Sequence, residues 1–446
     1  MDPCTSTLLT DLYQLTMAQS YVEHGMEEPA VFEFFVRTMP PTRGFFIAAG
    51  LEQLVDYLEH MRVQSWELDW MRKSGRFSQA FVEYMERFRF TGHLHAMPEG
   101  TIFFAHEPIV RITAPLPQAQ LVETRLINLL QYQTLVASKA ARAVLAAQGA
   151  PLIDFGLRRA HGAEAGLLAA RASYLAGFHG SATVLAASLF DIPVFGTMAH
   201  AFIQAHIKEV EAFEHFAESH PGNVILLIDT YQTEEGAKKV VALAPRLRRK
   251  GITIKGVRLD SGDLAAHAVQ VRRILDEGGL PEVKITASGN LDEYAIQQLR
   301  AAQAPIDFFA VGTKMTVSAD VPYLDCAYKL QEYAGRPCRK KSEGKATWPG
   351  RKQVYRHYSA DGRIEGDVLT CEDDTQQTGE PLLQPIMEAG KRLHDLPPLT
   401  QLREYTATQL ARLPERLRAL ERGATLEVTV SSALQQLARD VDAQLW

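Results

Sequence analysis

The sequence predicts an α/β fold that follows a mixed α+β region, and two observations support this prediction. Short apolar runs recur from residue 151 to residue 311, and a segment with helical periodicity follows each of them. Small or polar residues stand directly after each run, as they do where a buried strand ends. Such β/α units form either an open doubly wound sheet or a barrel, and the pattern leaves both open.

Six of these runs are the predicted strands of the central sheet. They occupy residues 152–155, 193–195, 224–228, 254–259, 283–286 and 308–311. In both architectures ligands gather at the carboxyl ends of the strands. The polar residues that directly follow the runs are therefore the first candidates for a functional site.

The region before the β/α units, residues 1–145, is predicted as an α+β domain. Helix-like periodicity covers residues 8–24 and 53–61, and strand-like apolar segments cover residues 30–36 and 109–113. The β/α units then occupy a second domain.

The second domain is assigned to residues 146–330, and a third region to residues 331–446. The third region begins with a basic, glycine-containing stretch at residues 336–356. It ends in a predicted helical tail from about residue 402, and we expect it to pack back on the first domain.

The composition excludes several classes of protein. With 446 residues, of which 46% are hydrophobic, the chain is long enough for two domains. The formal net charge of -6 provides no bulk positive field, so no nucleic-acid partner is expected. The cysteines form no Cys-X-X-Cys pair, which argues against a zinc site or a disulfide framework. They are Cys4, Cys326, Cys338 and Cys371.

A cytoplasmic location without membrane spans is expected. The first ten residues lack the basic segment of a signal peptide. The longest run free of Asp, Glu, Lys and Arg, residues 172–190, contains serine, threonine and histidine and is too polar to cross a bilayer. We interpret this run as a buried helix and strand.

Two glycine-containing pairs at predicted strand ends are candidates for phosphate binding. Ser288-Gly289 and Gly312-Thr313 stand where a strand leads into a helix, so free helix amides and a hydroxyl can cradle a phosphate. Ordinary turns use the same residues, and this alternative stays open.

Carboxylates at two strand ends are candidates for Mg²⁺ binding. Asp260 and Asp263 stand in one turn and Asp229 follows the neighbouring run, and Mg²⁺ prefers oxygen ligands. Helix capping by Asp is the alternative, and spacing alone favours it.

Cations, a histidine and two aromatic residues complete the candidate set. Arg158, Arg159 and Arg258 emerge from strand ends, where a guanidinium can grip a carboxylate or phosphate, although surface salt bridges use the same residues. His200 follows an apolar run and Gly-Thr, which suits a nucleophilic imidazole. Tyr13 and Phe155 can sandwich an aromatic ligand, and burial in the core is the alternative.

Several motifs, in order, resemble the nicotinate phosphoribosyltransferase family. They are TDLYQLTM at residues 10–17, DFGLRRAHG at 154–162, GTMAH at 196–200, RLDSGD at 258–263, SGNLDE at 288–293, VGTK at 311–314, SEGKAT at 342–347 and PGRK at 349–352. One such motif alone is a modest signal, but their shared order over most of the chain is specific.

The resemblance implies an irregular α/β barrel of the type II phosphoribosyltransferase kind with an N-terminal mixed α+β domain. It also implies a homodimer with shared active sites, in which the first domain contributes to the partner's site. The implied activity forms nicotinate mononucleotide and pyrophosphate from nicotinate and phosphoribosyl pyrophosphate, with ATP as co-substrate and Mg²⁺ as cofactor, in NAD salvage.

The resemblance also implies roles for the candidate residues. His200 matches the histidine that ATP phosphorylates, and Tyr13 matches a tyrosine that stacks on the pyridine ring, opposite Phe155. Arg258, Thr197 and Arg158 are implied nicotinate contacts. The implied site as a whole consists of catalytic His200, Asp260 and Arg258, of substrate-binding Tyr13, Phe155, Arg158, Thr197, Arg258, Ser288, Gly289, Gly312 and Thr313, and of Asp229 and Asp260 as Mg²⁺ ligands.

Three alternatives remain beside this resemblance. A nicotinamide phosphoribosyltransferase is expected to carry an Asp at the position of Ser181 or Ala182, and none stands there. A quinolinate phosphoribosyltransferase is a shorter, ATP-independent chain without a counterpart of His200. A catalytically dead, nucleotide-binding relative is also possible in any enzyme fold, but the retained His200 and Arg258 argue against it.

Overall fold

The computed structural model describes residues 5–421, 425–426 and 428–444. The chain divides into two compact units. The first unit comprises Met1–Ser138 and Tyr323–Trp446, and the second comprises Lys139–Pro322. Each unit contains a sheet with a core of its own.

The first unit is built on an antiparallel sheet of seven strands in the order β13-β12-β1-β5-β3-β17-β18. One of its interior strands, β1 (Pro29–Val36), is buried at every residue after the first, as a strand covered on both faces should be. The other strands are β3 (His93–Ala96), β5 (Pro108–Pro115), β12 (Cys326–Tyr333), β13 (Arg336–Pro337), β17 (Gln384–Glu388) and β18 (Lys391–Arg392).

Helices and strands predicted for residues 1–145 are confirmed in type and place. The segments at 8–24 and 53–61 correspond to α1 (Leu12–Glu23) and α2 (Leu51–His60), and those at 30–36 and 109–113 to β1 and β5. The other helices here are α3 (Ser65–Ser74), α4 (Gln79–Glu86), α5 (Leu116–Leu121) and α6 (Glu123–Ala147), which continues into the second unit.

The C-terminal region holds strands that the sequence interpretation missed. A four-stranded sheet has the order β16-β14-β15-β19, with β14 (Lys352–Tyr358), β15 (Ile364–Cys371), β16 (Glu380–Pro381) and β19 (Val428–Val430). The predicted helical tail from about residue 402 is confirmed in its described part, except that a short strand interrupts it. It consists of α15 (Leu399–Arg412), α16 (Glu415–Arg418), β19 and α17 (Ser432–Gln444).

Local chemistry explains the interrupted tail. Pro414 follows the end of α15, and the residue before a proline is disfavoured in helical conformation. Val428, Thr429 and Val430 are β-branched and pair in parallel with β15. Cys4 lies outside the described residues, and Cys326, Cys338 and Cys371 are free thiols.

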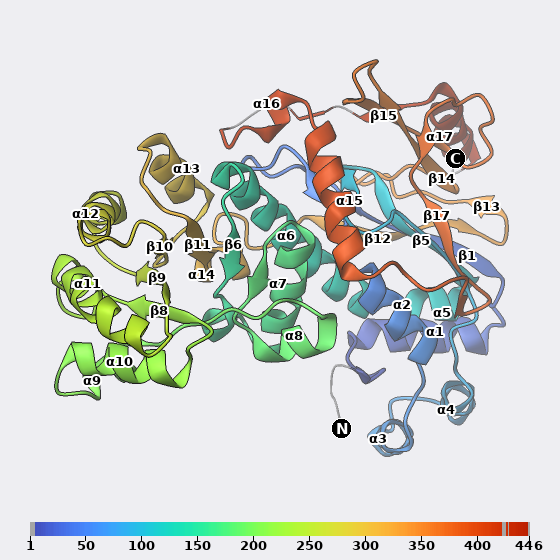
Figure 1. Ribbon diagram of the computed structural model, residues 1–446. Helices are drawn as coiled ribbons and strands as arrows, with labels where there is room; N and C mark the ends of the chain where they lie inside the picture. Colours follow the sequence, from blue (N-terminus) through green and yellow to red (C-terminus); the bar gives the residue numbers. More distant parts are fainter. Residues whose placement is uncertain (1–4, 422–424, 427, 445–446) are drawn as a thin grey trace. The chain divides into compact units, whose positions relative to one another are not determined.

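The second unit is built on six parallel strands in the order β7-β6-β11-β10-β9-β8 (Figure 1). They are β6 (Leu152–Asp154), β7 (Gly180–Ser181), β8 (Val224–Leu227), β9 (Ile254–Leu259), β10 (Lys284–Ala287) and β11 (Phe308–Val311). The sheet curls into an irregular half-barrel, which confirms the predicted fold class together with the mixed α+β unit.

Five of the six predicted strands are confirmed within about two residues of their expected ends. The run at 193–195 contributes only a single parallel bridge, between Val194 and Ser181. The strand that occupies this part of the sheet, β7, was missed because it is only two residues long and contains a glycine.

Helices follow the strands and return the chain to the start of the sheet. They are α7 (Ala163–Leu175), α8 (Val184–Phe190), α9 (His200–Gln204), α10 (Glu209–Ser219), α11 (Thr233–Arg249), α12 (Leu264–Glu277), α13 (Glu293–Ala301) and α14 (Thr313–Thr316). As a result, the loops after β6, β9, β10 and β11 meet at one edge of the sheet.

The interpretation of residues 172–190 as buried is correct only for its first part. The end of α7 and both residues of β7 are buried, whereas α8 exposes Val184, Leu185 and Leu189. Within the described part of the chain, no helix combines the length and the apolar character needed to span a membrane.

Candidate active site

The second unit contains a cavity of about 1280 Å³ at the carboxyl ends of its strands. Its size exceeds the usual range of about 300–1000 Å³ for small-molecule sites, so it has room for more than one ligand. The predicted site residues that line it are Phe155, Arg158, Thr197, His200, Arg258, Asp260, Ser288, Gly289, Gly312 and Thr313.

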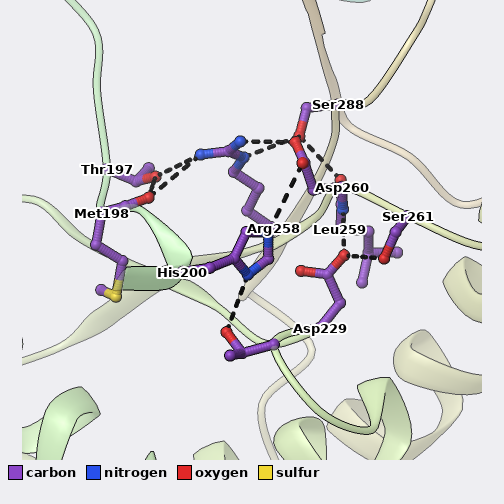
Figure 2. A network of polar contacts seen from close by, with 10 residues as sticks. Thr197, Met198, His200, Asp229, Arg258, Leu259, Asp260, Ser261 and Ser288 are labelled. Carbon is purple, nitrogen blue, oxygen red and sulfur yellow. Dashed lines mark hydrogen bonds and ion pairs between the residues drawn. The ribbon is translucent and has the colours of Figure 1, made fainter. Parts of the chain in front are cut away.

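Arg258, near the end of β9, lines the cavity and forms the centre of a network of polar contacts (Figure 2). Its Nε donates to Ser288 Oγ at 2.8 Å and its Nη2 to Asp260 Oδ1 at 2.6 Å. Its Nη1 donates to Thr197 Oγ1 at 3.2 Å and to the carbonyl of Met198. Because all three of its nitrogens donate hydrogen bonds, the guanidinium is fixed in position before any ligand binds.

The same guanidinium lies over an aromatic ring. Arg258 Cζ is 5.3 Å from the ring centroid of Phe155, which follows β6. This is a cation-π distance. Arg258 and Phe155 therefore combine a positive charge and an aromatic face in one part of the cavity.

Asp260 is an ionised carboxylate with two distinct oxygens. Burial alone would raise the pKa of Asp260, but hydrogen bonds from Ser288 and Arg258 outweigh it and hold the pKa below its usual value. Both of these bonds end on Oδ1. Oδ2 instead faces His200, whose Nε2 lies 3.8 Å away.

His200 is the first residue of α9 and borders the cavity. Its Nδ1 shares a hydrogen bond of 3.1 Å with Thr230 Oγ1. The side chain is 40% exposed, so the imidazole is held at one edge and open to a ligand elsewhere. That combination suits a nucleophile.

Asp229 lies behind the site and does not line the cavity. Its Oδ2 accepts hydrogen bonds from the Asp260 backbone N–H at 2.8 Å and from Ser261 Oγ at 2.7 Å. Its Oδ1 is buried and has no hydrogen-bond partner. Asp229 therefore fixes the turn that carries Asp260.

The two interpretations of the acidic turn are resolved for Asp263. Its side chain accepts hydrogen bonds from the N–H groups of Ala265 and Ala266, so it caps α12 as the alternative predicted. Among the residues that the structure describes, no group of three or more His, Cys, Asp or Glu side chains is arranged to hold a metal ion.

The two glycines of the candidate phosphate site allow neighbouring loops to approach closely. Gly289 has φ of 91°, and a Cβ there would lie 1.9 Å from the carbonyl oxygen of Asp260. A Cβ on Gly312 would lie 2.8 Å from the carbonyl oxygen of Phe155. Larger residues would therefore separate the loops after β6, β9, β10 and β11.

Two further cations border the cavity. Arg159 was named from the sequence as a strand-end cation but was not placed in the implied site, and Lys314 was not singled out. Arg159 donates to Thr313 Oγ1 at 3.1 Å, and Lys314 pairs with Asp292 at 2.8 Å. Both stand in strand-end motifs beside predicted site residues, and that adjacency was the available signal. With Arg158 and Arg258, they give the cavity a positive character suited to phosphate groups.

Tyr13 lies on α1 in the first unit, with its ring 48% exposed. Burial, together with the charges of Glu123 and Asp11, raises the pKa of its hydroxyl. The cavity belongs to the second unit and Tyr13 to the first. The expected stacking of Tyr13 on a ligand therefore stays a prediction.

The fold and the site together define a class of protein: an α/β enzyme that binds anionic substrates at the carboxyl ends of a curled parallel sheet. Three family models match the chain in order. Residues 8–131 match the nicotinate phosphoribosyltransferase N-terminal domain, residues 151–336 the nicotinate phosphoribosyltransferase family, and residues 375–438 the nicotinate phosphoribosyltransferase C-terminal domain.

Relatives of known name agree over nearly the whole chain. A nicotinate phosphoribosyltransferase of Mycobacterium tuberculosis is 47% identical over 435 residues, covering 97% of this chain and 93% of the relative. One from Bacillus subtilis is 36% identical over 456 aligned residues, covering 95% and 93%. This chain belongs to the nicotinate phosphoribosyltransferase family.

A solved structure supports the same conclusion for the fold. The crystal structure of human nicotinic acid phosphoribosyltransferase is similar with a TM-score of 0.88 at 29% identity, covering 97% of this chain and 100% of that one. The similarity spans both units.

Proposed function

We propose that this chain forms nicotinate mononucleotide and pyrophosphate from nicotinate and phosphoribosyl pyrophosphate, in NAD salvage, and couples this reaction to ATP hydrolysis through a phosphorylated His200. One observation carries the proposal. The fixed guanidinium of Arg258 lies beside the ring of Phe155 and in the same network as Asp260, which faces the accessible His200. The names of the relatives support the same reaction.

Nicotinate is a flat aromatic ring with one carboxylate, and the cavity offers a partner for each part. Arg258 supplies the cation for the carboxylate, and Thr197, which already bonds Arg258, supplies a hydroxyl. Phe155 supplies an aromatic surface. We assign Arg158, which borders the cavity, as a further cation for the substrate anions.

Phosphoribosyl pyrophosphate carries its charge on phosphate groups, which match the loops after β10 and β11. Ser288 and Gly289 form one loop and Gly312 and Thr313 the other, and both line the cavity. Main-chain N–H groups in such loops bind phosphate oxygens without adding bulk. The glycines permit this close approach.

In the sugar-transfer step, the bond between the anomeric carbon and a pyrophosphate oxygen breaks and a bond to the nicotinate ring nitrogen forms. The protein positions that nitrogen in line with the breaking bond. Fixed cations stabilise the negative charge that develops on the departing pyrophosphate. No side chain needs to remove a proton, because the attacking nitrogen carries a lone pair.

In the coupling step, a neutral nitrogen of His200 attacks the γ-phosphorus of ATP. The nitrogen–phosphorus bond forms as the bond to the ADP oxygen breaks, and later hydrolysis of the phosphohistidine releases phosphate. The 40% exposure of the side chain provides the access that this attack requires.

Mg²⁺ is the cofactor that we assign to the pyrophosphate side of the site. The ion is often held through one or two carboxylates together with substrate phosphates. Asp260 lines the cavity, and its Oδ2 accepts neither of the hydrogen bonds from Arg258 and Ser288, so this oxygen is the first candidate ligand. Asp229 Oδ1, which is buried behind the cavity without a hydrogen-bond partner, is the second candidate. When bound, Mg²⁺ neutralises charge on the phosphates.

A homodimer with shared active sites is part of the proposal. The apolar side chains of Val184, Leu185 and Leu189 on α8 are 72%, 54% and 57% exposed, and such clusters mark protein contacts. The half-exposed ring of Tyr13 is likewise free for a partner's site. We assign Tyr13 to stack on nicotinate across the interface, opposite Phe155.

The test is product formation by the purified full-length chain with phosphoribosyl pyrophosphate, Mg²⁺ and ATP. Nicotinate, nicotinamide and quinolinate are supplied in turn, and the mononucleotide is quantified by chromatography. Nicotinate is expected to be turned over at least about 100-fold more efficiently than nicotinamide, because a site with a dedicated cation for the carboxylate leaves that cation unpaired when the uncharged amide binds. Preference for another base would replace the assignment, and no turnover of any base would support a non-catalytic relative.

A further inference from the structure

Thr230 is placed to act on His200, although no motif singled it out. It follows Asp229 in the loop after β8, and its Oγ1 lies 3.1 Å from His200 Nδ1. Among the residues that the structure describes, this hydroxyl is the one hydrogen-bond partner of the imidazole.

Packing alone does not fix the imidazole. The side chain is 40% exposed, and α9, which begins at His200, is only five residues long. An exposed ring on a short helix samples several rotamers unless a specific contact selects one. The bond to Thr230 supplies that contact.

The loop after β8 positions both members of the His200–Asp260 pair. Asp229 Oδ2 accepts a hydrogen bond of 2.8 Å from the backbone N–H of Asp260. Thr230, the next residue, holds the ring of His200. The 3.8 Å approach between His200 Nε2 and Asp260 Oδ2 thus depends on two neighbouring residues of one loop.

We infer that Thr230 is a positioning residue for His200, whose hydroxyl holds the imidazole in the orientation from which it attacks the γ-phosphate of ATP. This inference rests on the proposed function, because it concerns the coupling step. Thr230 does not border the cavity and has no assigned contact with a substrate. It acts through His200 alone.

The size of the expected effect follows from geometry. Displacement of a reacting group by about 1 Å can lower a rate by about 100-fold. Loss of the Thr230 hydroxyl should therefore slow phosphorylation of His200 by about 10- to 100-fold. Because Thr230 does not border the cavity, the KM for ATP should change by less than about 3-fold.

The test compares Thr230→Val, which removes the hydroxyl at nearly constant volume, with Thr230→Ser, which keeps it. Thr233→Val is the control, since Thr233 is a nearby threonine, the first residue of α11, that forms no hydrogen bond with His200. The rate of acid-labile phosphate incorporation from γ-labelled ATP is measured in each full-length protein. Slow incorporation in Thr230→Val, with near wild-type rates in Thr230→Ser and Thr233→Val, is the expected result.

Wild-type incorporation by Thr230→Val, or failure of Thr230→Ser to rescue it, would overturn the inference. A crystal structure of Thr230→Val provides a second readout, in which His200 is expected to leave its wild-type rotamer. If wild type takes no phosphate from ATP, the coupling part of the proposed function fails. The crystal structure then still decides the role of Thr230, because a retained rotamer overturns it.

Discussion

The guanidinium Nη2 of Arg258 lies 2.6 Å from Oδ1 of Asp260, two residues along the same chain segment. This pair links the cation proposed for nicotinate to the carboxylate that faces His200. In the proposed function, substrate binding and ATP coupling therefore share one network.

Replacement of Arg258 by lysine should raise the KM for nicotinate by about 10- to 100-fold. A single ammonium group cannot reach Ser288, Thr197 and Asp260 together, although it keeps the charge. Steady-state kinetics with varied nicotinate measure the effect. Arg273→Lys on the exposed face of α12 is the control, and an unchanged KM in Arg258→Lys would refute the assigned contact.

Ala182 borders the cavity, and its replacement by aspartate should specifically weaken the binding of nicotinate. A new carboxylate repels the substrate carboxylate across a partly dry site. We expect kcat/KM for nicotinate to fall by about 10-fold or more in Ala182→Asp, with a smaller loss in Ala182→Asn, which has the same shape without charge. Equal losses in the two variants would show that volume, not charge, sets the preference.

Gly289 should tolerate alanine far less well than Gly279, although both have positive φ. A Cβ at Gly289 meets the carbonyl oxygen of Asp260, whereas a Cβ at Gly279 meets nothing within 4 Å. Gly279→Ala should cost about 1 kcal/mol of unfolding free energy, and Gly289→Ala clearly more, with a raised KM for phosphoribosyl pyrophosphate. Urea unfolding and kinetics measure both, and equal costs would contradict the close approach.

Stability should fall with rising pH because of one buried carboxyl group, Asp154. Burial raises the pKa of Asp154 to about 6, despite hydrogen bonds from Ser181 and the Gly156 N–H. The pKa of Asp in an unfolded chain is about 3.9. The stabilisation by protonated Asp154 is therefore complete below that pH and is lost as pH rises through about 6. The loss amounts to about 3 kcal/mol.

The isosteric variant Asp154→Asn isolates this effect. The asparagine side chain stays neutral at every pH. The free energy of unfolding of the variant relative to wild type should therefore rise by about 2 kcal/mol between pH 4 and pH 7. Urea unfolding of both proteins across this range measures the difference. Parallel pH profiles of the two proteins would mean that Asp154 does not titrate in this window.

The features predicted correctly from the sequence are those that leave a periodic pattern of apolar residues or a group of polar residues at strand ends. The five long parallel strands, and the clustering of Arg258, Asp260, Ser288 and Thr313 at one edge, follow from runs of apolar residues and the geometry of β/α units. The two-residue strand β7 and the β-rich region after residue 350 were missed, because short or alternating strands give weak signals. Thr230 was missed because its role depends on a contact with a distant residue.

The most direct test of the account is the effect of ATP on nicotinate mononucleotide formation in wild type and in His200→Ala. Each protein is incubated with labelled nicotinate, phosphoribosyl pyrophosphate and Mg²⁺, with and without ATP. The account predicts that ATP stimulates wild type and that the variant loses this stimulation together with its acid-labile phosphate. ATP-stimulated product formation that survives in His200→Ala would contradict the account.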